Sequence, residues 1–433
     1  MAETVAGRRG TGAPLGRPFR WLWAAYAVSA LGTRLAFNAF PLVALQVLHV
    51  GPARVAALAA AGAAVGAVVA VPLGPWVEFR RKRPVMGAMD AVRFAALISV
   101  PAAYALGLLG FAQLLVVAVV VAAADIAFGA ASGAHLKALV PPADRLRANA
   151  RFESTAWTTT ILGPPLGGAA AGLFGPVAAI AADAVSYLLS ALGLRAIGGR
   201  EPQPEHPAAP LLRPAGLAEG WRYLLTDPVL RPLFLNTVLV NGLIMAAEPP
   251  LAVLMLGGLG FAPWQYGLAF AVPCVGGLVG SRLAGRLVTR FGRHRVLRTT
   301  GVLRVCWLPG LALVGPGPGG LLLVMAVEFG LILCVGVFNP VLATHRLDRT
   351  PTDRLARTLA AWSVTGKAVI AAFTALWGVL AAVAGPRAAI AIAGLLALAT
   401  PLLLPRRELG ADQPPGDAAG HDGAGRTTGR TAR

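Results

Sequence analysis

The sequence predicts an all-α integral membrane protein with twelve transmembrane helices, arranged as two related six-helix bundles. Three observations lead to this fold class. Apolar runs of about 20 residues, long enough to span a bilayer, recur along the chain. Basic connections alternate with nearly uncharged ones, and two of the basic loops occur twice, about 210 residues apart. The 433 residues are 56% hydrophobic and only 13% charged, and no useful period-two alternation favours a membrane barrel.

The apolar runs set the expected spans and domains. An N-terminal bundle is predicted at 21–197 and a C-terminal bundle at 229–404, joined by a linker at 198–228 and flanked by tails at 1–20 and 405–433. The second tail lacks apolar periodicity, and we expect it to be disordered. The twelve spans are predicted at 21–48, 54–73, 85–108, 111–133, 150–173, 176–197, 229–256, 264–288, 296–315, 320–342, 358–384 and 387–404.

Basic residues are concentrated in the even-numbered connections. The odd-numbered ones carry little more than Arg54 and Arg387. Because cytoplasmic loops are enriched in Lys and Arg, both termini are predicted to be cytoplasmic, in a bacterial cytoplasmic membrane, with an uncleaved first span. The basic connections hold Arg80, Arg81, Lys82 and Arg83; Lys137, Arg145, Arg147 and Arg151; Arg290, Arg293, Arg295 and Arg298; and Arg346, Arg349, Arg354 and Arg357.

A short amphipathic helix is predicted late in the linker. Leu217, Trp221 and Leu224 share one helical face, and Glu219 lies off it. Asp227-Pro228 would end this helix. Such a helix is typical of the membrane surface, and we expect it on the cytoplasmic face.

The first duplicated loop follows the second and eighth predicted spans. It starts at Gly74 and Gly285, where glycine permits close helix approach and a tight turn. Glu78 and the arginines after it would pair with each other or with helix ends and stabilise one transporter state; the simpler reading is that the arginines only retain the loop inside. Thr289 replaces the glutamate in the second copy, which predicts an asymmetric gate. The expected gate residues are Gly74, Glu78, Arg81, Arg83, Glu153, Gly285 and Arg293.

Two further pairs support a duplication. Asp144 and Asp353 each follow a proline by two residues and precede a predicted span, so we expect them to be helix N-caps. Arg93 and Arg304 are separated by the same 211 residues as the duplicated glycines. The chain therefore reads as two copies of one membrane unit, as alternating access requires.

The segment Gly74-Pro-Trp-Val-Glu-Phe-Arg-Arg-Lys-Arg83 resembles the signature loop of the major facilitator superfamily. Gly163-Pro-Pro-Leu-Gly-Gly168 is similar to a signature associated with its antiporters, and the order of motifs from Asp125 to Arg231 resembles the branch of macrolide-efflux proteins and the enterobactin exporter. The resemblance covers nearly all of 18–404. It implies the major facilitator fold, two pseudo-symmetric six-helix bundles, and proton-driven export of a small molecule.

Some residues depart from the family pattern. Glu78 stands where an Asp is usual, Gly32-Thr33-Arg34 replaces the frequent Gly-Asp-Arg, and the fourth span lacks a buried arginine. In the fifth span, the prolines would bend the helix and the glycines would admit a close neighbour. The segment is therefore expected to act as a hinge or seal, with ordinary close packing as the alternative. Its residues are Gly163, Pro164, Pro165, Gly167 and Gly168.

Ionisable side chains inside membrane spans are costly and mark candidate functional sites. Asp125, Glu248 and Glu328 lie in the fourth, seventh and tenth spans, which the resemblance implies line the cavity together with the first. A carboxylate in this setting can exchange a proton, as a proton-coupled exporter requires. Structural ion pairing is the alternative for each. The candidate coupling or substrate residues are Arg34, Asn38, Asp125, Glu248, Glu328 and Lys367.

Other function classes find little support. The net charge of +19 comes from arginines at span ends, without the basic face and interleaved aromatics of a nucleic-acid binder. Cys274, Cys306 and Cys334 lie in apolar segments and the six histidines are scattered, so we expect no metal site and no cofactor. No zinc pattern or nucleophile elbow indicates an enzyme. A sensor or scaffold would need soluble segments longer than the linker and tails.

We therefore predict a monomeric secondary transporter that exports an amphipathic small molecule, such as an antibiotic, siderophore or secondary metabolite. The expected mechanism is alternating access in exchange for protons. A facilitator or importer on the same fold remains the alternative. The expected partners are the lipid bilayer, the substrate and protons, with no nucleic acid, and the proton gradient is the expected energy source. The fold does not fix the substrate.

Overall fold

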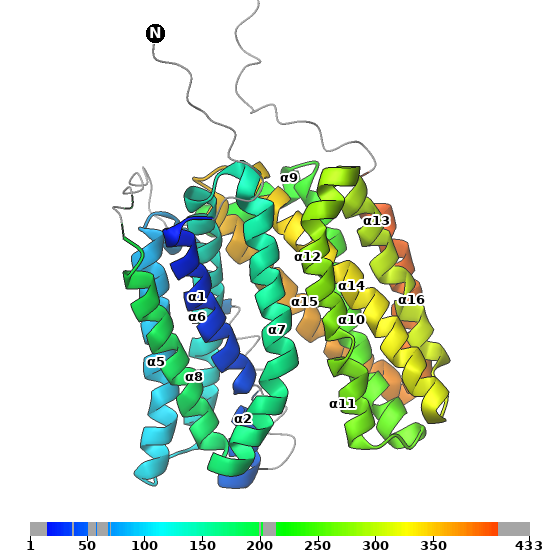
Figure 1. Ribbon diagram of the computed structural model, residues 1–433. Coiled ribbons are helices and arrows are strands. Elements are labelled where there is room, and N and C mark those ends of the chain that lie inside the picture. Colours follow the sequence, from blue (N-terminus) through cyan, green and yellow to red (C-terminus); the bar gives the residue numbers. More distant parts are fainter. Residues whose placement is uncertain are drawn as a thin grey trace, which may run out of the picture.

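Two groups of long helices lie side by side in the computed structural model (Figure 1). It describes residues 15–36, 39–50, 58, 68–69, 71–198, 201 and 214–405, and every regular element within them is helical. The first group holds α1 (Arg17–Leu35), α2 (Ala39–Leu42), the π-helix η1 (Val43–Val47), α4 (Leu73–Glu78), α5 (Lys82–Ala105), α6 (Phe111–Leu139), α7 (Pro142–Phe174) and α8 (Pro176–Arg195).

The second group repeats this plan. It holds α10 (Leu230–Ala252), the π-helix η2 (Val253–Gly258), α11 (Pro263–Ala271), α12 (Cys274–Phe291), α13 (Arg293–Cys306), the 3₁₀-helix η3 (Leu308–Leu313), α14 (Gly317–Arg349), α15 (Leu355–Ala384), α16 (Pro386–Ala399) and the 3₁₀-helix η4 (Thr400–Leu403). We call the two groups the N-half and the C-half. The linker helix α9 (Pro214–Thr226) joins them at the top of Figure 1, which we call the α9 end.

The two halves share backbone details that support a duplication. A π-helix follows the first long helix of each half. Gly175 and Gly385 adopt φ of 83° and 86°, a conformation that favours glycine, and Pro176 and Pro386 begin the next helices. The same sequence thus makes the same helical corner at the end opposite α9 in each half.

Ten described stretches are long and apolar enough to cross a membrane, which fits a multi-pass membrane protein. The 33-residue helix α7 is not among them, although it extends along the whole height of the N-half (Figure 1). Its charged and polar first turns, from Asp144 onwards, lower its hydropathy. The expected second span at 54–73 lies mostly outside the described residues, so the total of twelve stays a prediction.

Two helices extend beyond the predicted membrane spans by about two turns. α7 begins at Pro142 rather than 150, and α14 continues to Arg349 rather than 342, so both extend beyond the expected apolar runs. The predicted N-caps are wrong. Asp144 lies inside the first turn of α7, where its charge still favours the helix start, and α15 begins after Arg354 rather than at Asp353.

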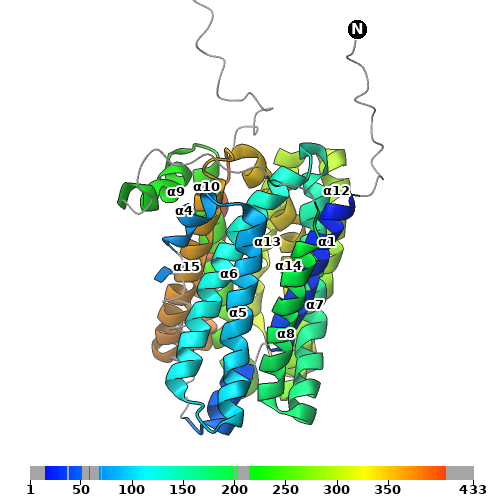
Figure 2. The same ribbon diagram turned by 90° about the vertical axis from the view of Figure 1, so that its left-hand side faces the viewer.

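The linker helix α9 packs on the C-half, as its apolar face predicts. Leu224 is fully buried, and Nε1 of Trp221 donates a hydrogen bond to Thr365 Oγ1 on α15 at 2.8 Å. Asp227 then accepts hydrogen bonds from the backbone N–H groups of Val229 and Leu230 at 2.8 Å and caps α10. Figure 2 shows α9 beside α4 and α15 at the α9 end, so the linker lies where the two halves meet.

Candidate functional site

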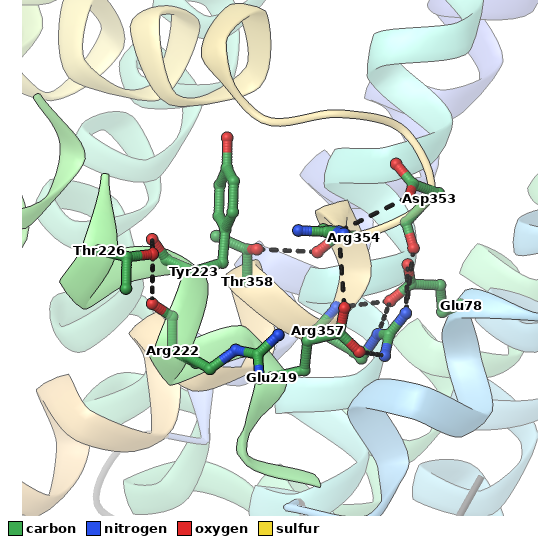
Figure 3. Close-up of polar contacts among 9 residues, drawn as sticks. All are labelled: Glu78, Glu219, Arg222, Tyr223, Thr226, Asp353, Arg354, Arg357 and Thr358. Carbon is green, nitrogen blue, oxygen red and sulfur yellow. Dashed lines mark hydrogen bonds and ion pairs between the residues drawn. The ribbon is translucent and has the colours of Figure 1, made fainter. Parts of the chain in front are cut away.

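A buried ion-pair cluster joins the halves at the α9 end. Arg357, in the first turn of α15, donates from Nε to Glu78 Oε2 at 2.7 Å, and its backbone N–H donates to the same oxygen at 3.3 Å. Nη1 of Arg357 also contacts Glu219 of α9, and Arg354 lies 3.5 Å from that carboxylate (Figure 3). Glu78 is only 4% exposed. One guanidinium therefore ties together the N-half, the C-half and the linker.

A second cluster lies beside the first. Asp348, near the end of α14, pairs with Arg145 of the N-half at 2.7 Å and with Arg293 of its own half at 2.9 Å. Nζ of Lys137 donates to the carbonyl of Thr350. These contacts hold the second duplicated loop of the N-half against the C-half. Arg293, a predicted gate residue, thus acts through the carboxylate that it shares with Arg145.

Polar contacts continue a few turns deeper between α7 and the C-half. Asn149 donates to Thr344 at 2.9 Å, and the hydroxyls of Ser154 and Ser281 lie 2.7 Å apart. Glu153 Oε1 accepts from Asn339 at 2.9 Å. Glu153 also accepts from Trp157 at 3.0 Å, one turn along the same helix. The predicted gate residue Glu153 therefore does contact the opposite half, through an amide and not through the basic loops.

The duplicated glycines and arginines behave unequally. A Cβ on Gly74 would lie 3.1 Å from Ala360 Cβ, so this glycine does permit close approach of the halves. Gly285 has nothing within 4 Å of its Cβ direction, and the predicted close approach there is wrong. Nη1 of Arg83 donates to the carbonyls of Ile197 and Gly198 in its own half, which makes it an anchor for the end of α8. Arg81 is exposed.

The basic run after Glu78 does not supply its main partner. Lys82 Nζ bonds to backbone carbonyls, including those of Val77 and Arg80, at 3.0 and 2.8 Å. Thr289, the counterpart of Glu78, is exposed and donates only to Arg286 O in its own turn. The predicted asymmetry of the two copies therefore has a structural basis: only the first places a carboxylate across the interface.

An ion pair also joins the halves midway along the helices. Asp125 of α6 and Lys367 of α15 approach to 3.0 Å. Their side chains are 56% and 34% exposed although each lies near the middle of a long helix, so they face solvent between the halves. Lys367 thus pairs with a carboxylate of the opposite half.

Asp125 also belongs to a polar cluster inside the N-half. Arg93 of α5 lies 3.6 Å from Asp125 and 2.7 Å from Asp90. Asp183 of α8 accepts a hydrogen bond from Thr33 of α1 at 3.3 Å and so links neighbouring helices. The guanidinium of Arg93 is buried in this cluster, whereas the side chain of Asp125 is partly exposed.

Glu248 and Glu328 form a second acidic site, in the C-half. They lie on α10 and α14, close enough for their charges to interact. Glu328 is 7% exposed, whereas Glu248 is exposed. Among the described residues, neither carboxylate has a salt-bridge or hydrogen-bond partner. No described Lys, Arg or His therefore lies within ion-pair distance of either acid.

The remaining candidates cluster where α1 meets α7. Arg34 lies in the last turn of α1, near the middle of the candidate span Arg17–Val47, and no described carboxylate lies within ion-pair distance of it. Asn38 lies outside the described residues. A Cβ on Gly163 would lie 2.3 Å from Arg34 Cβ, and one on Gly167 would lie 2.0 Å from Leu35 O. These two glycines therefore serve close helix packing.

The other residues of the expected hinge, Pro164, Pro165 and Gly168, are exposed and do not show the close contacts of Gly163 and Gly167. Gly168 has nothing within 4 Å of its Cβ direction. Pro164 and Pro165 lie inside α7, which continues unbroken from Pro142 to Phe174. In this conformation the segment is a packing surface; whether it also bends during transport stays a prediction.

The family model described as Major Facilitator Superfamily matches residues 22–335. The chain belongs to this superfamily. It is a transporter of that class, which agrees with the resemblance carried by the signature loop. Within the part of the chain that the structure describes, no group of three or more His, Cys, Asp or Glu residues could hold a metal ion.

Known proteins of two kinds are similar to this transporter. The "Multidrug efflux pump Tap" of Mycobacterium tuberculosis and that of Mycobacterium bovis are 28% identical over 318 residues, covering 70% of this chain and 73% of the relative. A bacterial homologue of the iron transporter ferroportin, solved in an outward-facing state, matches with TM-score 0.76 at 15% identity, over 90% of this chain and 98% of that one.

Two further solved structures share the fold. The human organic anion transporter MFSD10 matches with TM-score 0.72 at 17% identity, over 90% of this chain and 100% of that one. The Escherichia coli fucose:proton symporter matches with TM-score 0.65 at 14% identity, over 90% and 98%. At these identities the likeness concerns architecture, because the substrates named differ widely.

The sequence identified gate residues such as Glu78, but not the residues that they contact. Arg357, Glu219, Asp348 and Asn339 were not assigned to the gate. Arg357 lies in the second copy of the Asp-Arg-Leu loop, and Glu219 lies on the polar face of α9, so both were visible as charges. Their contacts span 279 residues from Glu78 to Arg357 and 138 from Glu219 to Arg357, which one sequence does not reveal.

Proposed function

We propose that the protein exports a cationic, amphipathic small molecule across the bacterial cytoplasmic membrane in exchange for protons. The α9 end would face the cytoplasm, as the basic loops there favour. The similarity to a pump named for multidrug efflux supports export. A facilitator or importer on the same fold is the alternative.

The pair Glu248 and Glu328 carries the proposal. Two neighbouring carboxylates inside membrane spans are costly unless they are neutralised. Because no described side chain supplies a cation, a proton or a positively charged substrate must do so. Protons and substrate would then compete for the same two groups, and this competition is sufficient to couple their opposite movements.

The arrangement of contacts supports alternating access. Polar contacts between the described parts of the halves gather at the α9 end and in the adjacent turns of α7, with the Asp125–Lys367 pair farther along. Figure 1 shows the helices of the two halves farther apart at the opposite end. This conformation would release substrate outside and admit protons to the exposed Glu248. Breaking the α9-end contacts would then open the cytoplasmic side.

Inverted membrane vesicles provide the test. With the lipophilic cation tetraphenylphosphonium as probe, we expect uptake that requires a pH gradient and stops when the gradient is collapsed. Glu248→Gln and Glu328→Gln should abolish the gradient-driven part. Thr289→Ala, which changes an exposed side chain that bonds only within its own turn, is the control and should keep uptake. Uptake that does not depend on the pH gradient would favour a facilitator. Gradient-driven loss of the probe from preloaded inverted vesicles would favour an importer.

A further inference from the structure

The C-half contains a buried arginine that no carboxylate balances. Arg304 of α13 is 0% exposed. Its Nη2 donates to Asn236 Oδ1 at 2.5 Å, and its guanidinium stacks 3.7 Å from the centre of the Phe338 ring. Nε and Nη1 have no acceptor among the residues that the structure describes. Among the described residues, which include all of the C-half helices, no acid forms an ion pair with it.

The N-half shows what the second copy lacks. Arg93, 211 residues earlier, also stacks on a phenylalanine ring, that of Phe128, at 4.5 Å. However, Arg93 pairs with Asp90, and the position three residues before Arg304 is Gly301. The second acid near Arg93 is lost too, because Asp125 precedes Phe128 by three residues whereas Val335 precedes Phe338. The repeat has kept the cation and its aromatic platform without the anions.

A lone buried guanidinium is unstable without a partner. An arginine keeps its charge, so it does not become neutral as a lysine would. Isolated charge inside an apolar helix bundle carries a large desolvation penalty. Cys334 lies near enough to influence Arg304, but a buried thiol stays neutral and supplies no charge. Asn236 offers only an amide oxygen, and its own Nδ2 is committed to Thr400 O at 2.8 Å.

We propose that a small monovalent anion of the chloride class binds in the C-half against the unpartnered N–H groups of Arg304. The occupant must be small because Arg304 and Asn236 are both 0% exposed, so a lipid phosphate cannot reach them. The anion supplies the charge that Asp90 supplies to Arg93 in the N-half. Asn236 of α10 already bonds to Arg304 of α13 and to Thr400 of η4. The bound anion would stabilise the packing of these three elements.

The test is the chloride dependence of thermal unfolding. The purified full chain is melted in chloride or gluconate at constant ionic strength and followed by tryptophan fluorescence. We expect Tm to rise by about 2 °C or more, to saturate with chloride, and to rise with bromide too. Equal Tm of the wild type in chloride and gluconate would overturn the proposal.

Two variants and a control locate the effect. Asn236→Asp places a carboxylate against Nη2 of Arg304, and Arg304→Gln removes the charge. Each variant should have the same Tm in chloride and in gluconate. Asp353→Asn, exposed and remote in the gate loop, should keep the full chloride response. A chloride response that persists unchanged in Arg304→Gln would place the anion elsewhere and overturn the assignment, even if Asn236→Asp fails to fold.

Discussion

Arg357 Nε and Glu78 Oε2 lie 2.7 Å apart, and this contact joins the C-half to the N-half at the α9 end. The carboxylate is 3% exposed and the guanidinium 12%. The same arginine also contacts Glu219 of α9. A movement of either half or of the linker helix would therefore break at least one of the contacts that Arg357 makes. The pair is therefore well placed to report and control the opening of this end.

Removing Glu78 should weaken the closed α9 end. Loss of one partner of a buried pair costs about 3 kcal/mol, or roughly 100-fold in the equilibrium between closed and open states. Spin labels at Phe174 and Leu313, exposed residues at the ends of α7 and η3 that lie away from α9, would measure the change. In Glu78→Ala we expect a shorter distance between these labels.

Thr289→Ala is the matched control for the gate, because Thr289 occupies the same place in the second copy and contacts only its own turn. It should leave both the label distance and transport unchanged. Loss of transport in this variant, with Glu78→Ala still active, would show that the charge switch has been assigned to the wrong copy.

The gate should close more firmly as the pH falls. Burial raises the pKa of the Glu78 carboxyl above its ordinary 4.5, despite the opposing effect of the Arg357 guanidinium. A group whose pKa is higher in the closed than in the open state takes up protons on closing, so acid favours closure and alkali opposes it. As the pH falls from neutral toward the ordinary 4.5 of a glutamate, the population with separated labels should increase. Glu78→Gln should remove this slope, and an unchanged slope would assign it to another group.

Asp125 and Lys367 should be energetically coupled. Because both are partly exposed, the coupling is modest, about 1 kcal/mol or less. Asp125→Asn and Lys367→Gln should each slow transport, and the double variant should be less impaired than the sum of the two. Strict additivity of the effects on transport rate would argue that the two residues act separately, with Asp125 serving Arg93 instead.

The glycines of α7 should differ in their tolerance of a side chain. Gly163→Val would place atoms into Arg34, and we expect a loss of stability of about 2 kcal/mol with low yield of folded protein. Gly168→Ala, five residues along the same helix, meets nothing within 4 Å and should fold normally. Yield and Tm in detergent distinguish them. A stable, active Gly163→Val would contradict close packing as the role of this glycine.

Local sequence patterns predicted the local features well. The apolar runs located most of the long helices, and the composition of α9 predicted its buried face. The duplicated loop singled out Glu78 and its asymmetry with Thr289. Patterns failed where a feature depends on distant chain segments. Gly285 looks like Gly74 in sequence, yet only Gly74 has a neighbour, Ala360, across the interface.

Helix boundaries failed for a related reason. The polar first turns of α7 lie outside the apolar run, but they remain helical, pack against α14 and α12, and find side-chain partners such as Thr344 and Asn339. An apolar run alone therefore does not indicate where this helix begins. Similarly, Lys367 and Asp125 were each recognisable as costly charges, but their pairing over 242 residues required the fold.

Proton release on substrate binding tests the central claim most directly. The purified protein in weakly buffered solution is mixed with tetraphenylphosphonium, and a pH-sensitive dye follows the protons released. If Glu248 and Glu328 bind either protons or the cation, the wild type should release protons and the Glu248→Gln/Glu328→Gln double variant should release none. Undiminished release from the double variant would contradict the exchange of protons for substrate at these two carboxylates.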